Sequence, residues 1–173
     1  MKRVLILSNE ESAESPGLIT DAVRYGLPQG LCNIPNLQSV VRSLGAYEVV
    51  VLYHKQIGEV GRLAPDAVLL SGIFTDRALP YDTVLREYEG VISWLRTADV
   101  PTFGICLGLQ LICAAFGVAT EFHEDVMAEI SGYFKNVFRR EMPDCNRRQA
   151  YLPKGCTVLH NPVGTAPGCV FTA

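Results

Sequence analysis

Four short, nearly continuous apolar runs alternate with helical patterns, and this alternation constrains the fold more than any other feature of the chain. The runs are Arg3–Leu7, Glu48–Tyr53, Ala67–Ser71 and Pro101–Ile105. Continuous apolar runs of this length are typical of parallel strands that are covered on both faces. The alternation therefore predicts a parallel, doubly wound α/β sheet, in which ligands bind outside the carboxyl ends of the strands.

Three helices are expected around these strands. Each places apolar residues at helical spacing on one face: Leu37, Val40, Val41 and Leu44 in the first, Val84, Tyr88, Val91, Ile92 and Leu95 in a second over about 82–97, and Leu109, Leu111, Ile112, Ala115 and Phe116 in the third. Gly45 and Gly117 follow the first and third helices as natural stops.

The remainder of the chain, from Val118 onwards, shows weaker helical periodicity and more Pro and Gly. Strand-like runs near Ile130–Phe138 and Thr157–His160 predict a small antiparallel extension that leads to a final return strand. Because no linker, repeat or low-complexity segment interrupts the chain, we expect one domain over residues 1–173. The chain reaches Ala173 without a capping or polar tail, and we expect the C-terminal part of this domain to be incomplete.

Composition narrows the range of partners. Hydrophobic residues make up 49% of the chain and charged residues 19%, with a net charge of -3. Such a chain folds and gives no electrostatic reason to bind nucleic acid or a membrane surface. The basic group Lys135, Arg139, Arg140, Arg147 and Arg148 is interrupted by acidic residues and is interpreted as a solvated strand edge or loop.

Six cysteines occur without a C-x-x-C pair, which argues against a disulfide framework or a zinc site and favours a cytoplasmic location. The first apolar run is too short for a signal peptide or a membrane span. No P-loop, dinucleotide fingerprint or metal-ligand set is present in the sequence, so we expect no cofactor and no metal.

The segment that bears most on chemistry is the Gly-x-Cys-x-Gly at Gly104, Cys106 and Gly108, where an expected strand runs directly into an expected helix. A tight turn of this kind presents a nucleophile in strained geometry, and the flanking glycines avoid clashes with the crossing backbone. The free N–H groups of the helix N-terminus stabilise a thiolate, and the N–H of Leu107 is placed to donate to an oxyanion. A buried structural cysteine is the alternative interpretation of the same turn.

The run Gly104–Gln110, followed by an apolar helix that closes at Gly117, resembles the nucleophile segment of class I glutamine amidotransferases. In that family the cysteine attacks the side-chain amide of glutamine, forms a thioester and releases ammonia. The resemblance implies that Cys106 is the nucleophile, that Gln110 contacts bound L-glutamine, and that a separate synthase subunit receives the ammonia.

Other segments resemble the same family in the same order along the chain. The run Ala67–Gly72 is similar to the family's strand that ends in Ser-Gly-Gly-Pro, which implies an oxyanion donor in the loop at Gly72 and Ile73, although Ile73 replaces the second glycine. Glu129–Phe134 resembles a Glu-x-Gly strand, and Leu152–Gly155 resembles a Leu-Pro-x-Gly turn. The expected architecture is therefore flavodoxin-like, with helices on both faces of a mostly parallel sheet and a small antiparallel extension.

The family also uses a histidine and a glutamate in a final Gly-x-Gln-Phe-His-Pro-Glu segment, and no His-x-Glu occurs in these 173 residues. Three histidines remain as substitute bases. His54 follows a strand but precedes a polar turn, His123 lies in an acidic cluster typical of a solvated turn, and His160 lies at a strand end. None of the three is assigned as the catalytic base.

Four alternatives stay open. PfpI-like cysteine hydrolases carry histidine directly after the cysteine, where this chain has Leu107, and dienelactone-hydrolase-like enzymes need Asp and His from later strands. A γ-glutamyl peptide hydrolase on the amidotransferase fold is a further alternative. The last is non-enzymatic: a degenerate amidotransferase-like domain that binds a ligand or a partner without turnover.

Overall fold

The computed structural model describes residues 1–9, 33–72 and 81–171. The chain divides into two compact units, Met1–Ala115 and Phe116–Ala173, and each unit has its own buried apolar cluster. The predicted single domain over residues 1–173 stays a prediction. No described helix is both long and apolar enough to cross a membrane.

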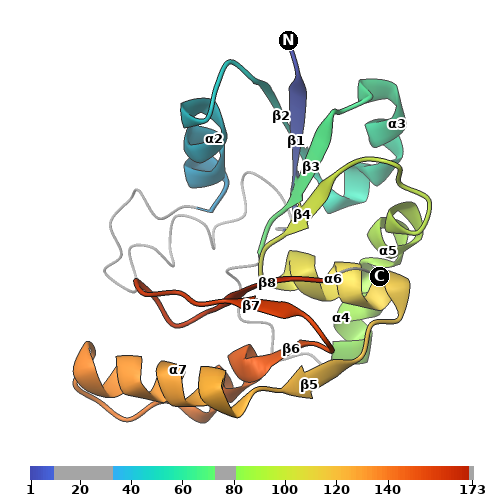
Figure 1. Cartoon of the computed structure of the whole chain (residues 1–173). Coiled ribbons are helices and arrows are strands. Elements are labelled where there is room, and N and C mark those ends of the chain that lie inside the picture. The colour runs from blue at the N-terminus through green and yellow to red at the C-terminus, as the bar shows by residue number, and fades with distance from the viewer. Residues whose placement is uncertain (10–32, 73–80, 172–173) are drawn as a thin grey trace. The chain divides into compact units, whose positions relative to one another are not determined.

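Unit 1 is built on a four-stranded parallel sheet (Figure 1). Its strands are β1 (Arg3–Ser8), β2 (Glu48–Tyr53), β3 (Ala67–Leu70) and β4 (Thr102–Gly104), in the order β2-β1-β3-β4. All three pairings are parallel, with Leu5 opposite both Val50 and Val68. Each apolar run predicted as a strand is a strand, and the α/β, flavodoxin-like architecture is confirmed.

The helices of unit 1 are α2 (Asn33–Ser43), the 3-10 helix η2 (His54–Glu59), α3 (Val60–Leu63), α4 (Tyr81–Glu87), α5 (Glu89–Leu95) and α6 (Leu107–Phe116). Figure 1 shows α2 on one side of the sheet and α3 with α5 on the other. This arrangement follows from right-handed crossovers when the strand order reverses after β2. The core between sheet and helices includes Leu5, Leu70, Val91 and Leu111.

One helix predicted for unit 1 is two helices in the structure, so the prediction of a single continuous helix is wrong. The pattern over residues 82–97 predicts one helix, whereas the structure has α4 and α5 separated at Tyr88, whose φ of −100° and ψ of 15° are not helical. Tyr88 is 1% exposed, and its hydroxyl donates a 2.5 Å hydrogen bond to the carbonyl oxygen of Asn9. This long-range contact accompanies a break in the helix that the local apolar stripe does not signal.

Unit 2 consists of β5 (Thr120–Phe122), α7 (Glu124–Asn136), the 3-10 helix η3 (Asp144–Ala150), β6 (Tyr151–Pro153), β7 (Thr157–Leu159) and β8 (Gly168–Val170). The predicted strand near Ile130–Phe138, and with it the Glu-x-Gly strand at Glu129–Phe134, is wrong because this segment lies mostly in α7. The buried residues Val126, Ile130 and Phe134 lie four apart, which is the spacing of one helix face and not of a strand.

The antiparallel character of unit 2 is confirmed. β5 pairs with β6 and β7 pairs with β8, each pair forming its own two-stranded sheet. The predicted Leu-Pro-x-Gly turn joins β6 to β7, with Gly155 at a φ of +74° that favours glycine. The predicted strand at Thr157–His160 corresponds to β7.

The basic group of unit 2 lies at the end of α7, just beyond it and in η3, and not on a strand edge. Its side chains are exposed, as predicted. Two of them pack on aromatic rings: the Arg140 guanidinium lies 5.5 Å from the ring centre of Phe134, and that of Arg147 lies 4.8 Å from the ring centre of Phe122. These cation–π contacts hold the arginines against unit 2.

Candidate functional site

The turn between β4 and α6 presents Cys106 to solvent in a strained backbone conformation. Cys106 has a φ of +52°, in the left-handed region that residues with a Cβ rarely adopt, and its side chain is exposed. α6 begins at the next residue, Leu107. A strained, exposed cysteine between a strand and a helix N-terminus is the geometry that the Gly-x-Cys-x-Gly pattern predicts.

The two flanking glycines are required by close backbone contacts. A Cβ on Gly104 would lie 2.5 Å from the carbonyl carbon of Gly108 and 2.5 Å from the nitrogen of Leu109. A Cβ on Gly108 would lie 2.5 Å from the carbonyl oxygen of Leu70. No side chain fits at either position, so the strand, the turn and the helix approach one another as closely as their backbones allow.

Hydrogen bonds fix the turn on both sides of the cysteine. The N–H of Gly108 donates to the carbonyl of Ile105 at 2.9 Å, and the N–H of Gln110 donates to the carbonyl of Cys106 at 3.2 Å. The N–H of Leu107 lies in the first turn of α6, where the helix itself provides no acceptor. That N–H is therefore suited to bind an oxyanion formed next to the sulfur.

The predicted site residues lie in two places, the nucleophile turn and the end of the neighbouring strand β3. Cys106, Leu107 and Gln110 share one turn, with Leu107 buried and the Gln110 side chain exposed. Gly72 follows β3, the strand next to β4, and the N–H of Ile105 donates to the carbonyl of Leu70 at 2.9 Å. Gly72 therefore lies two residues beyond the strand that borders the nucleophile turn, whereas Ile73 lies outside the described residues.

The position of His54 argues against a role as the base for Cys106. It begins η2 directly after β2, is 3% exposed, and stacks on Tyr88 with 4.5 Å between ring centres. β2 and β4 are the two outer strands of the sheet. Three strand spacings, about 14 Å, therefore separate the ends of these two strands. The polar turn that the sequence predicts at His54 is instead a buried aromatic contact.

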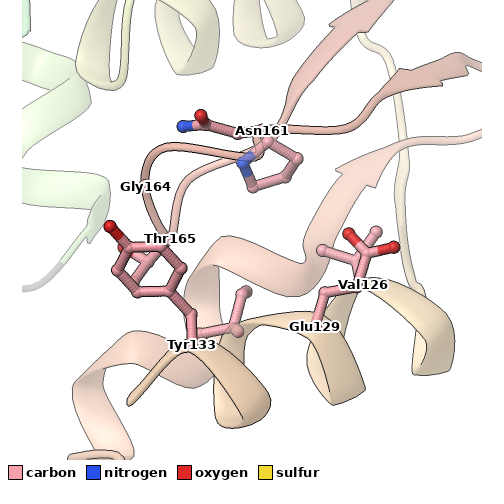
Figure 2. Close-up of a pocket in the computed structure, with 8 residues that line it drawn as sticks. Val126, Glu129, Tyr133, Asn161, Gly164 and Thr165 are labelled. Atoms are coloured by element: carbon pink, nitrogen blue, oxygen red, sulfur yellow. The ribbon is translucent and has the colours of Figure 1, made fainter. Parts of the chain in front are cut away.

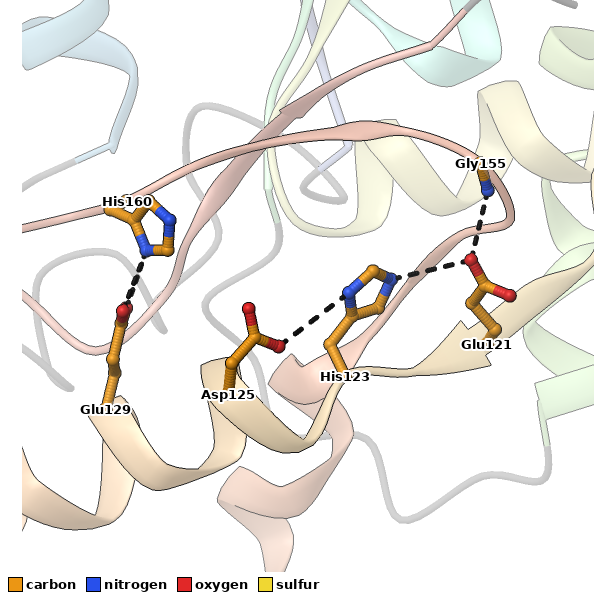
Figure 3. Close-up of polar contacts among 6 residues, drawn as sticks. All are labelled: Glu121, His123, Asp125, Glu129, Gly155 and His160. Carbon is orange, nitrogen blue, oxygen red and sulfur yellow. Dashed lines mark hydrogen bonds and ion pairs between the residues drawn. The ribbon is translucent and has the colours of Figure 1, made fainter.

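The other two histidines belong to unit 2 and have carboxylate neighbours (Figure 3). His123, the N-cap of α7, lies 3.8 Å from an oxygen of Glu121 and 4.0 Å from one of Asp125, beyond hydrogen-bond distance. Nδ1 of His160 lies 2.8 Å and 2.9 Å from the two carboxylate oxygens of Glu129. The hydrogen bond to Glu129 and its negative charge raise the pKa of His160 above its usual value.

Two concave surfaces of unit 2 adjoin this His160–Glu129 pair. One is a small pocket of about 40 Å³ between α7 and the loop at residues 161–167, with Tyr133 and Thr165 among its lining residues (Figure 2). The other is an open groove of about 770 Å³ along α7 that includes His160 and Glu129. Among the described residues, no group of three or more histidine, cysteine, aspartate or glutamate side chains is arranged to hold a metal ion.

Two residues that the sequence does not mark as functional connect to the nucleophile turn through β3. Asn9 and Ser71 are fully buried at the carboxyl ends of β1 and β3, and they hydrogen-bond to each other. Their position at the carboxyl ends of two predicted strands was the available signal, since parallel sheets bind ligands at that edge.

Comparison with known proteins gives one family match and several partial relatives. The family model described as "Glutamine amidotransferase class-I" matches residues 30–159. A "GMP synthase [glutamine-hydrolyzing]" from Bartonella bacilliformis is 27% identical over 146 residues, covering 77% of this chain and 26% of the synthase. A "Putative competence-damage inducible protein" from Acetivibrio thermocellus is 41% identical over 62 residues, covering 36% of this chain and 15% of that protein.

The chain thus spans only a small part of the length of these relatives. A crystal structure titled "The crystal structure of the protein CinA with unknown function from Thermoplasma acidophilum" aligns with a TM-score of 0.38 at 18% identity, covering 97% of this chain and 79% of that one. A score this low supports no argument about this chain.

Proposed function

Because the chain belongs to the class I glutamine amidotransferase family, we propose that Cys106 attacks the side-chain amide of L-glutamine and that the ammonia released serves a partner synthase. The observation that supports this most directly is the backbone of the nucleophile turn. Cys106 combines a left-handed φ of +52° with exposure at the start of α6, between two glycines that cannot accept a Cβ. A cysteine that only fills the core needs none of these features.

The proposed chemistry proceeds in two balanced steps. The Cys106 sulfur bonds to the carboxamide carbon of glutamine, the C–N bond breaks, and the thiol proton leaves with the nitrogen as ammonia. Water then attacks the thioester carbon, glutamate departs, and the sulfur regains a proton. The N–H of Leu107 stabilises the oxyanion in both steps, and the backbone at Gly72 is the proposed second contribution. Gln110, exposed on the same turn, is proposed to contact the bound glutamine.

A second function is favoured by the positions of the histidines. His54 is the one histidine of unit 1, it follows β2, the edge strand opposite β4, and it is buried against Tyr88. With no histidine of unit 1 beside the sulfur, Cys106 would bind glutamine or a γ-glutamyl compound without rapid turnover. The domain would then act as a binding or regulatory module.

Covalent labelling tests the proposed role of Cys106. The protein is incubated at neutral pH with a chloroketone analogue of L-glutamine, and peptides are mapped by mass spectrometry. We expect the main adduct at Cys106, which is exposed, whereas Cys113 is buried and burial raises the pKa of the Cys156 thiol. Cys106→Ser is the control, and labelling at other cysteines alone would overturn the proposal.

Release of ammonia separates the two functions. Ammonium and glutamate are measured with L-glutamine and, in parallel, with a γ-glutamyl dipeptide. Release that Cys106→Ser abolishes supports the hydrolase, and the preferred substrate identifies its class. Labelling of Cys106 without release from either substrate supports the binding module.

A further inference from the structure

A buried polar side chain follows β1 directly and lies at the edge of the sheet where the nucleophile turn begins. Asn9 is 0% exposed, and Ser71, after the neighbouring strand β3, is also 0% exposed. Fully buried polar side chains are uncommon and are usually kept for the hydrogen bonds they make. The contacts of Asn9 therefore indicate what this side chain does.

Asn9 and Ser71 are joined by two hydrogen bonds. The N–H of Asn9 donates to Oγ of Ser71 at 3.0 Å, and Nδ2 of Asn9 donates to the carbonyl oxygen of Ser71. Oγ of Ser71 donates in turn to the carbonyl oxygen of Gly72 at 2.8 Å. The chain of contacts therefore runs from β1 into the backbone that follows β3.

The orientation of the Asn9 amide is determined by these contacts. Oδ1 of Asn9 is buried without a hydrogen-bond partner, while Nδ2 faces the Ser71 carbonyl. If the amide were turned over, two oxygens would face each other, so the donor must point at Ser71. The Nδ2 donor of Asn9 is thus satisfied, while its Oδ1 acceptor stays buried without a hydrogen bond.

Tyr88 completes the network from the helical layer. Its hydroxyl donates to the carbonyl oxygen of Asn9 at 2.5 Å, and its ring is buried against His54. The same residue interrupts the helix between α4 and α5. The break therefore coincides with a hydroxyl group that is hydrogen-bonded to the end of β1.

The network ends beside the proposed oxyanion site. Leu70, one residue before Ser71, accepts the hydrogen bond of Ile105 and touches Gly108, so the end of β3 is in direct contact with the nucleophile turn. The hydrogen bond from Oγ of Ser71 holds the Gly72 carbonyl oxygen at this same end of β3.

We infer that Asn9 and Tyr88 are positioning residues, which act through Ser71 to hold the Gly72 backbone in the orientation needed beside Cys106. This inference rests on the proposed function, because it assigns the network to the oxyanion side of that same site. Neither residue touches the substrate. Their effect is on the geometry of the carbonyl-binding backbone and not on the sulfur.

The test compares two alkylating reagents on the full chain. The chloroketone analogue of L-glutamine presents a carbonyl oxygen to the oxyanion site, whereas iodoacetamide reports the reactivity of the thiol alone. In Tyr88→Phe and Ser71→Ala we expect the rate of Cys106 labelling by the chloroketone to fall about tenfold, with the iodoacetamide rate unchanged. Ile92→Val, which removes one buried methylene from α5, is the matched control for loss of packing and should change neither rate.

Three outcomes are decisive. Equal chloroketone rates in wild type, Tyr88→Phe and Ser71→Ala would overturn the inference. A parallel fall of both rates, reproduced by Ile92→Val, would assign the network to stability alone and would also overturn it. If wild-type Cys106 reacts with iodoacetamide but not with the chloroketone, the proposed function fails instead.

A second measurement keeps the inference testable in that case. Amide hydrogen exchange is followed at Ser71, whose N–H donates to the carbonyl of Leu7 at 3.0 Å, with β2 as the reference. Tyr88→Phe should accelerate exchange at Ser71 but not in β2, and Ile92→Val should accelerate neither. Unchanged exchange at Ser71 in Tyr88→Phe would show that Tyr88 does not hold this backbone.

Discussion

The nucleophile turn of unit 1 and helix α7 of unit 2 are specified by opposite features of their side chains. The turn depends on side chains that are absent, because Gly104 and Gly108 touch backbone atoms that leave no room for a Cβ. α7 depends on side chains that are present, since Val126, Ile130 and Phe134 form its buried face. Added atoms should therefore damage the turn, and removed atoms should damage the helix.

The largest expected effect is on the helix. Phe134 is 4% exposed and packs on Phe138 with 5.1 Å between ring centres, so Phe134→Ala should lower the free energy of unfolding of unit 2. We expect a loss of about 3–5 kcal/mol, measured as lost hydrogen-exchange protection in α7 with β1 as internal reference. Equal loss in β1 would mean that the chain unfolds as the single domain predicted from sequence. Retained protection in α7 would contradict the side-chain account of this helix.

The second-largest expected effect comes from adding atoms to the nucleophile turn instead of removing them from the helix. Gly108→Ala should lower the free energy of unfolding of unit 1 by about 1–3 kcal/mol, because the new Cβ would overlap the Leu70 carbonyl. Gly132→Ala in α7 is the matched control, since nothing lies within 4 Å of its Cβ position. It should stabilise the helix by about 0.4–1 kcal/mol. Chemical denaturation measures both, and equal effects would refute the comparison.

A smaller effect concerns the strain at the nucleophile itself. Cys106 has a φ of +52°, so Cys106→Gly should be more stable than Cys106→Ala by about 1 kcal/mol, although neither variant can be labelled. Arg139 in unit 2 has a φ of +55°, and Arg139→Gly compared with Arg139→Ala should show the same difference. Thermal unfolding checks both pairs. An equal or lower stability of Cys106→Gly would mean that the turn is not strained.

The smallest effect is the pH dependence of unit 2. Glu129 raises the pKa of His160 above the usual 6.5, so protonated His160 is favoured in the folded state. Its stabilising contribution is fully present below pH 6.5 and is lost as pH rises through the raised folded pKa. Because both side chains are solvent-exposed, the change should be slight. Glu129→Gln should abolish the raised pKa, as followed by NMR titration of His160, and an unchanged titration would exclude this pairing in solution.

How far the fold could be predicted depended on whether local sequence determined each element. β2 has the predicted bounds, Glu48–Tyr53, because a continuous apolar run fits a buried parallel strand and little else. The resemblance of Glu129–Phe134 to a strand motif predicts a strand, whereas the four-residue spacing of Val126, Ile130 and Phe134 fits the helix α7 that the structure has. The break at Tyr88 involves a contact with Asn9, 79 residues earlier, which no local pattern contains.

The candidate site divides in the same way. The glycines and Cys106 could be predicted because tight turns restrict residue types strongly at fixed spacing. The contact between Leu70 and Gly108 could not be predicted, because it depends on which strand pairs with β4. The network of Asn9, Ser71 and Tyr88 was missed for the same reason, because its members come from three separate parts of the chain.

The Leu70 carbonyl has a mechanical consequence for the turn. It accepts the hydrogen bond of Ile105 and contacts Gly108. It therefore holds the chain one residue before Cys106 and two residues after it. Because the same peptide group contacts the turn on both sides of Cys106, the turn has little freedom to move relative to β3. Thermal vibration of that strand should therefore displace the sulfur with it, and the distance between the two should fluctuate less than either does against the rest of unit 1.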